Sequence, residues 1–268
     1  ASDTPTYALA QRETVSPVAT PIISAVGSQA QRSSRAGRVL VLDGDPTNGT
    51  VNAALWRGNG QSLTDASPAV RALALSHARA GAITGTLDDP ATASLAQAAY
   101  TLVVYPDDAT VAALAAHDVD TILVPYGASG AQALTFGLDR AGGLEKVGNT
   151  NSGIVWRVRP SALKPSRVRV ESSGGITTDV GSSQLRVDGN VDASGTLVLA
   201  ERADSGWRAS VDGVALTPTD PVDGWAQAFD MPAAGHLTVT YRAWWIIPWR
   251  VGAGICLVVV AASALSVW

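Results

Sequence analysis

The pattern of hydrophobic and polar residues divides the chain into two structural regions. Over residues 37–160, short apolar runs alternate with segments whose apolar residues recur at helical spacing, which predicts strands separated by helices. Over residues 161–242, apolar and polar residues alternate in short runs separated by Gly, Pro and Asp-Gly pairs, as is typical of an antiparallel β-sandwich. The pattern therefore predicts a Rossmann-like layered α/β domain followed by a β-sandwich domain.

In the first region, the all-apolar runs at 38–43 and 119–126 predict strands that are buried on both faces of a parallel sheet. Residues 101–105 fit either the end of a helix or a strand of their own. Helical spacing and capping residues predict further helices over 67–80, from Pro90 onward, over 107–118 and over 130–139.

In the second region, the sequence assigns different roles to its two tryptophans. Trp207 shares one strand face with Ala209 and Val211 at a spacing of two, and this predicts a core position. Trp225 follows Asp223 in a segment rich in turn residues, which predicts a ring presented to solvent, so both are candidate glycan-binding residues.

Two flanking segments differ from these regions. Residues 1–36 are rich in Ser, Thr, Ala and Gln and are predicted to be a connector. Residues 251–268 carry no charge, and with the preceding Trp-rich entry they predict the start of a transmembrane helix over 243–268. The residues expected at the membrane interface are Trp244, Trp245, Trp249 and Arg250.

Composition excludes several classes of protein. The net charge is -4 and the 19 Lys and Arg residues are scattered, so a nucleic-acid-binding surface is not predicted. The single cysteine, Cys256, excludes an internal disulfide framework. The three histidines lie far apart in the sequence, so neither a His-rich metal site nor a cofactor is predicted.

Asp43-Gly44-Asp45, directly after a buried strand, is open to two interpretations. An Asp-x-Asp pair in this place holds a divalent cation and a diphosphate in many nucleotide-sugar glycosyltransferases. Asp, Gly and the following Pro46 are also the residues that turns use, and we favour the turn. A calcium loop is not predicted because the required Gly and Glu are missing. The end of a buried strand is nevertheless where a ligand crevice is expected.

Ser129 lies in a predicted strand-to-helix turn that resembles the nucleophile elbow of hydrolases. The last glycine of the Gly-x-Ser-x-Gly pattern is replaced by Ala131, which weakens the match. In a hydrolase, His117 or His236 would be the base. Asp43, Asp45 and Ser129 are therefore grouped as a possible crevice, with neither catalytic nor metal-binding residues assigned.

The segment 201–242, which contains the string "GWRASVDG", resembles the extracytoplasmic region of large polytopic actinobacterial membrane proteins classed as family 2 glycosyltransferases. A more distant resemblance links this string to the "GWxAxVDG" segment of YfhO-type membrane proteins. In the glycosyltransferases the sugar-transferring domain lies elsewhere in the chain, on the cytoplasmic side. The resemblance implies a cell-membrane protein whose soluble domains are extracytoplasmic.

The sequence thus favours a non-catalytic accessory module of a cell-envelope glycosyltransferase that binds or positions an acceptor glycan or a partner protein. Its expected partners are the lipid bilayer, cell-wall glycan and the remaining domains of the same polypeptide. Two alternatives stay open. One is an extracytoplasmic hydrolase or metal-dependent transferase that uses the crevice at Asp43 and Ser129, and the other is a structural spacer.

Overall fold

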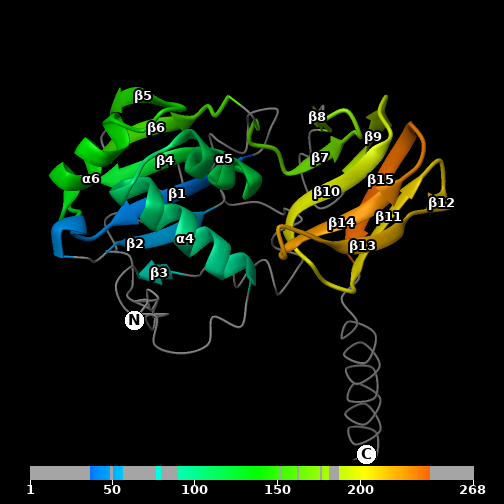
Figure 1. Cartoon of the computed structure of the whole chain (residues 1–268), viewed down its shortest axis with the longest axis horizontal. Helices are drawn as coiled ribbons and strands as arrows, with labels where there is room; N and C mark the ends of the chain where they lie inside the picture. Colours follow the sequence, from blue (N-terminus) through cyan, green and yellow to red (C-terminus); the bar gives the residue numbers. More distant parts are fainter. Residues whose placement is uncertain are drawn as a thin grey trace, which may run out of the picture.

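A computed structural model describes residues 37–48, 51–56, 77–79, 90–150, 153–161, 163–175, 177–180 and 187–241. The described residues form three β-sheets and three α-helices, so the fold is mostly β (Figure 1). One sheet and the helices make up the first half of the molecule, and the other two sheets make up the second half (Figure 1).

The first sheet is mixed, and the predicted Rossmann-like layered α/β domain is therefore wrong. Only β1 and β4 are parallel, whereas every other neighbouring pair is antiparallel. The physical reason is that β2 follows β1, and β6 follows β5, after short connections. Short connections suit antiparallel pairs, whereas parallel pairs need long crossovers. The strand order is β3-β2-β1-β4-β6-β5, with bounds β1 Arg38–Asp43, β2 Asn52–Trp56, β3 His77–Arg79, β4 Val119–Pro125, β5 Leu144–Asn149 and β6 Gly153–Val158.

Three helices accompany this sheet: α4 (Pro90–Val104), α5 (Asp108–Ala116) and α6 (Ala131–Asp139) (Figure 1). The segment that fitted either a helix end or a strand is the last turn of α4. The helix predicted over 67–80 is wrong near its end, where β3 lies, and residues 67–76 of it lie outside the described residues.

The second half consists of two antiparallel sheets that enclose a common core. Trp207 is 1% exposed in this core, and Ala209 and Val211 are buried beside it, as the spacing predicted. The orders are β13-β14-β10-β7-β8 and β12-β11-β15-β9, with bounds β7 Val168–Glu171, β8 Thr177–Asp179, β9 Val187–Val191, β10 Gly195–Arg202, β11 Trp207–Val211, β12 Val214–Ala215, β13 Thr217–Val222, β14 Ala226–Met231 and β15 Gly235–Tyr241.

A second hydrophobic cluster, apart from the core between the two sandwich sheets, extends across both halves of the molecule. Val198 and Ala200 of β10, together with Trp225 and Ala226, belong to the same buried cluster as the first sheet and its helices. Burial of this apolar surface stabilises the contact between the halves.

The structure does not show the predicted transmembrane helix over 243–268. That range lies outside the described residues, as do the predicted connector over 1–36 and the expected interface residues Trp244, Trp245, Trp249 and Arg250. None of the described helices is both long enough and apolar enough to cross a membrane.

Candidate functional site

The densest group of charged side chains lies at the junction between the two halves. The carboxylate of Glu201 forms ion pairs with Arg38, whose Nη2 lies 2.9 Å from Oε2, and with Arg167, whose Nη2 lies 2.8 Å from Oε1. Arg167 Nε also donates a hydrogen bond to Glu201 Oε1 at 2.9 Å. Arg38 Nη1 also donates to the carbonyl oxygens of Ala200, at 2.7 Å, and His117, at 2.9 Å. Arg38, Arg167 and Glu201 are each at most 1% exposed, so a ligand in solvent cannot reach them. We call Arg38, His117, Arg167, Arg169, Glu201 and Trp225 the junction cluster.

His117 is the C-cap of α5 and is fully buried in this cluster. Its ring stacks on Trp225 with 3.9 Å between centroids, and its Nε2 lies 3.1 Å from Ser94 Oγ. Burial, together with the positive charges of Arg38 and Arg169, lowers the pKa of His117 to about 3. The ring is therefore neutral near pH 7 and packs as part of the core.

The junction cluster overturns the prediction that the ring of Trp225 is presented to solvent. Trp225 is 2% exposed, because its ring lies against His117. Asp223 is exposed in the preceding turn, where its φ of 52° and the 73° of Gly224 reverse the chain. Arg167 and Arg169 are also buried, because the first half of the molecule covers their face of the strand.

The crevice predicted from the ends of two strands is present. Asp43 at the end of β1 accepts hydrogen bonds through Oδ1 from the main-chain N–H of Gly44, at 2.7 Å, and of Ser129, at 3.1 Å. Ser129 follows β4, so the parallel pair brings the two residues to the same edge of the sheet. Gly130 packs so closely here that a Cβ on it would overlap the Gly44 carbonyl oxygen.

The carboxylates of this crevice shape turns. Asp45 Oδ1 accepts from Thr47 N at 3.0 Å and from Thr47 Oγ1 at 2.6 Å, which orders the 3-10 turn Pro46–Asn48. The open volume beside it is about 460 Å³. Residues that line it include Asp45, Thr47, Ser129, Gln132 and Phe136.

The arrangement does not support the hydrolase alternative. Catalysis by Ser129 would require a base within hydrogen-bond reach. His117 bonds to Ser94, and both ring nitrogens of His236 are engaged, by Asp188 at 2.6 Å and by Asn190 at 3.1 Å. These are the two histidines whose side chains the structure describes, and neither serves Ser129. Within the described ranges, no three His, Cys, Asp or Glu side chains are grouped as a metal would require.

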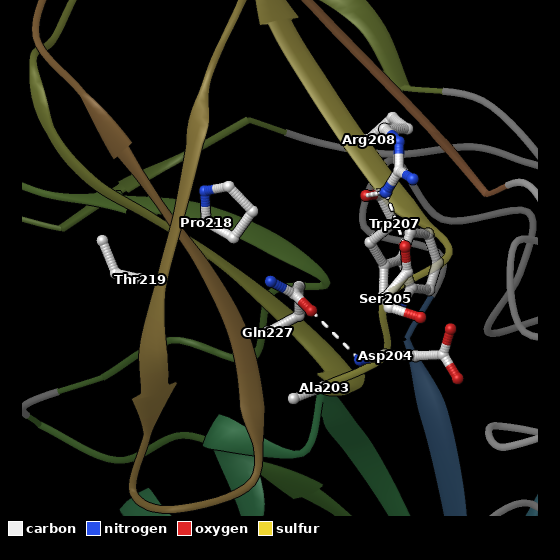
Figure 2. Close-up of a pocket in the computed structure, with 8 residues that line it drawn as sticks. All are labelled: Ala203, Asp204, Ser205, Trp207, Arg208, Pro218, Thr219 and Gln227. Atoms are coloured by element: carbon white, nitrogen blue, oxygen red, sulfur yellow. Dashed lines mark hydrogen bonds between the residues drawn. The ribbon is translucent and has the colours of Figure 1, made fainter.

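A second open site, of about 440 Å³, lies between the start of β11 and strands β13 and β14 (Figure 2). Gln227 is held in it by two main-chain contacts: its Oε1 accepts from Asp204 N at 3.1 Å, and its Nε2 donates to Ala228 O at 3.0 Å. Arg208 Nη1 donates to the carbonyl oxygens of Ser205, at 2.6 Å, and Trp207, at 2.7 Å. Both side chains are thus oriented before any ligand arrives. We call this site the sandwich groove.

The rest of the sandwich groove combines polar and apolar surface. Ser205 and Thr219 contribute hydroxyl groups, and Pro218 lies across the groove from Ser205 (Figure 2). The Asp204 carboxylate points away from Gln227, because its Oδ1 accepts from Gly206 N at 2.6 Å and from Tyr241 OH at 3.0 Å (Figure 2). The groove therefore presents hydrogen-bond donors and hydroxyls beside a small apolar wall.

Sequence reasoning missed the sandwich groove. Its walls come from the turn before β11 and from the paired strands β13 and β14, which sequence spacing alone does not bring together. One signal was available in the sequence. Arg208 lies between the core residues Trp207 and Ala209, so its side chain is on the strand face that points away from the core.

Comparison of the chain with known protein families, with curated proteins and with solved structures gives no match. The resemblance of residues 201–242 to glycosyltransferase-linked regions therefore stays a prediction. The function of the chain is therefore inferred from the chemistry of the crevice and of the sandwich groove.

Proposed function

We propose that the chain is a glycan-binding accessory module of a cell-envelope glycosyltransferase, and that it holds the acceptor glycan in the sandwich groove. The observation that carries the proposal is the pair of side chains, Gln227 and Arg208, that main-chain contacts orient around this open groove. Side chains that are already ordered lose less conformational entropy when a ligand binds.

The lining of the groove suits a polyhydroxylated ligand. Each sugar hydroxyl both donates and accepts, and the groove offers N–H donors on Arg208 and Gln227 together with the hydroxyls of Ser205 and Thr219. The ring of Pro218 offers an apolar surface for the C–H face of a sugar. Binding sites of this kind combine apolar walls with a few placed polar groups.

We favour binding over catalysis because the candidate catalytic side chains have other hydrogen-bond partners. Asp43 and Asp45 order turns through their carboxylates, and the described histidine side chains bond to residues other than Ser129. The resemblance of residues 201–242 supports an extracytoplasmic place for this module, with the transferase domain elsewhere in the same polypeptide.

The proposal is tested by calorimetric titration of the chain with arabinan and galactan oligosaccharides. We expect saturable binding that weakens about tenfold or more in Gln227→Ala and in Arg208→Ala, since each variant loses one or two hydrogen bonds to the ligand. Arg159→Ala, which alters a partly exposed arginine of the first half, is the matched control and should bind as the parent does.

Thermal melts of each variant show whether a loss of binding is a loss of folding. Unchanged affinity in Gln227→Ala and Arg208→Ala would refute the groove as the site. Absence of binding in the parent chain would favour the structural spacer.

A further inference from the structure

We infer that the crevice beside Asp45 and Phe136 is a second saccharide site. This inference rests on the proposed function, in that it takes the module to bind glycan. It concerns a different site, at the ends of β1 and β4 in the first half of the molecule, away from the sandwich groove (Figure 1).

The aromatic side chain of the crevice is available to a ligand. Phe136 on α6 is 64% exposed and lines the open volume. An aromatic ring offers a large flat apolar surface, and covering it with the C–H face of a sugar removes that surface from water. Exposure of so large an apolar side chain beside polar neighbours is typical of a binding surface.

The polar side chains around this ring are suited to hydroxyl groups. Asp45 is held in place through its Oδ1 by Thr47, and a carboxylate can accept several hydrogen bonds in addition. Gln132 and Ser129 on the same crevice both donate and accept. The first turn of α6 adds main-chain donors, because its N-cap Gly130 supplies no side-chain hydrogen bond.

The crevice and the sandwich groove can fill independently. They share no residue, and each is built on its own half of the molecule. Affinities for separate sites with no common partner are expected to change separately on mutation.

The test is the number of neutral oligosaccharides bound per chain, measured by calorimetry with arabinan and galactan fragments. We expect two sites in the parent, one site in Phe136→Ala, and one different site in Gln227→Ala. Tyr105→Ala is the matched control, because Tyr105 is also an exposed aromatic residue, at 72%, and does not line the crevice. The exposed position of Phe136 means that its variant should melt at the parent temperature.

The outcomes separate the two proposals. One site that is lost in Gln227→Ala and kept in Phe136→Ala overturns this inference and leaves the proposed function standing. If the parent has one site and only Phe136→Ala loses it, saccharide binding in the crevice is supported and saccharide binding in the sandwich groove is refuted. No binding to the parent overturns both.

Discussion

Polar and charged side chains are buried in the junction cluster, whereas others are exposed in the two open sites. At the junction, three arginines, a glutamate and a histidine are buried. Arg38 and Arg167 pair with Glu201, and Arg169 pairs with Glu171. In the crevice and the sandwich groove, Ser129, Gln132 and Arg208 are exposed at the rim of an open volume. A concentration of ionisable groups is therefore not the basis of the proposed binding sites, which depend on groups at an open volume.

The same comparison separates stability from binding. A buried charge that loses its partner costs several kcal/mol, because the remaining charge stays out of water. Surface substitutions away from such networks usually change stability by about 0.5 kcal/mol or less. We therefore expect junction variants to change folding and open-site variants to change binding.

The largest effect is expected for Glu201→Ala, which removes the carboxylate that Arg38 and Arg167 share. The free energy of unfolding should fall by about 3–5 kcal/mol in a urea titration. Glu145→Ala is the matched control. It breaks an exposed pair with Arg159, 3.7 Å apart, and should cost at most about 1 kcal/mol. Equal losses in the two variants would contradict the contrast between buried and exposed charges.

The outcome for Arg167 and Arg169 shows why sequence alone did not reveal the junction. Alternation along a strand separates its two faces, and it correctly placed Val168 and Val170 on the sandwich core. It cannot show what covers the other face, because that cover comes from residues such as Arg38, which is more than a hundred positions away in the chain. Trp225 was misjudged for the same reason, since its stacking partner His117 belongs to the first half.

The crevice, by contrast, could be predicted in part. Asp43 and Ser129 are 86 positions apart, yet each follows an apolar run that reads as a buried strand. Placing both runs in one parallel pair brings their ends together, and β1 and β4 are that pair. The directions of the other strands could not be obtained in this way, because apolarity indicates burial and not direction.

The second prediction concerns the pH dependence of the junction. The folded-state pKa of His117, about 3, lies below its usual 6.5, so the unfolded state binds the proton more tightly. The stabilisation is complete above pH 6.5 and is lost as the pH falls from there toward 3. At pH 5 the loss should be about 2 kcal/mol relative to pH 7.

Urea titrations of the parent and of His117→Gln between pH 5 and pH 7 measure this slope. The variant cannot be protonated, so its stability should vary less with pH than that of the parent. Phe136→Ala, in the crevice, should keep the full slope of the parent. If the stability of His117→Gln depends on pH as strongly as that of the parent, the group that titrates is not His117.

The smallest effect is expected from divalent metal ions at the crevice turn, where Asp43 and Asp45 accept hydrogen bonds from Gly44, Ser129 and Thr47. Asp43→Ala combined with Asp45→Ala removes these turn contacts, each of which contributes about 1 kcal/mol. Because the carboxylates serve as acceptors for the turn, manganese, magnesium and EDTA should leave the Tm unchanged in the parent and in the double variant alike. A ligand that binds the folded state raises its stability, so a metal site would be visible as a concentration-dependent rise in Tm. A rise of several degrees in the parent that the double variant lacks would show that the crevice holds a cation, and would reinstate the metal-dependent transferase alternative.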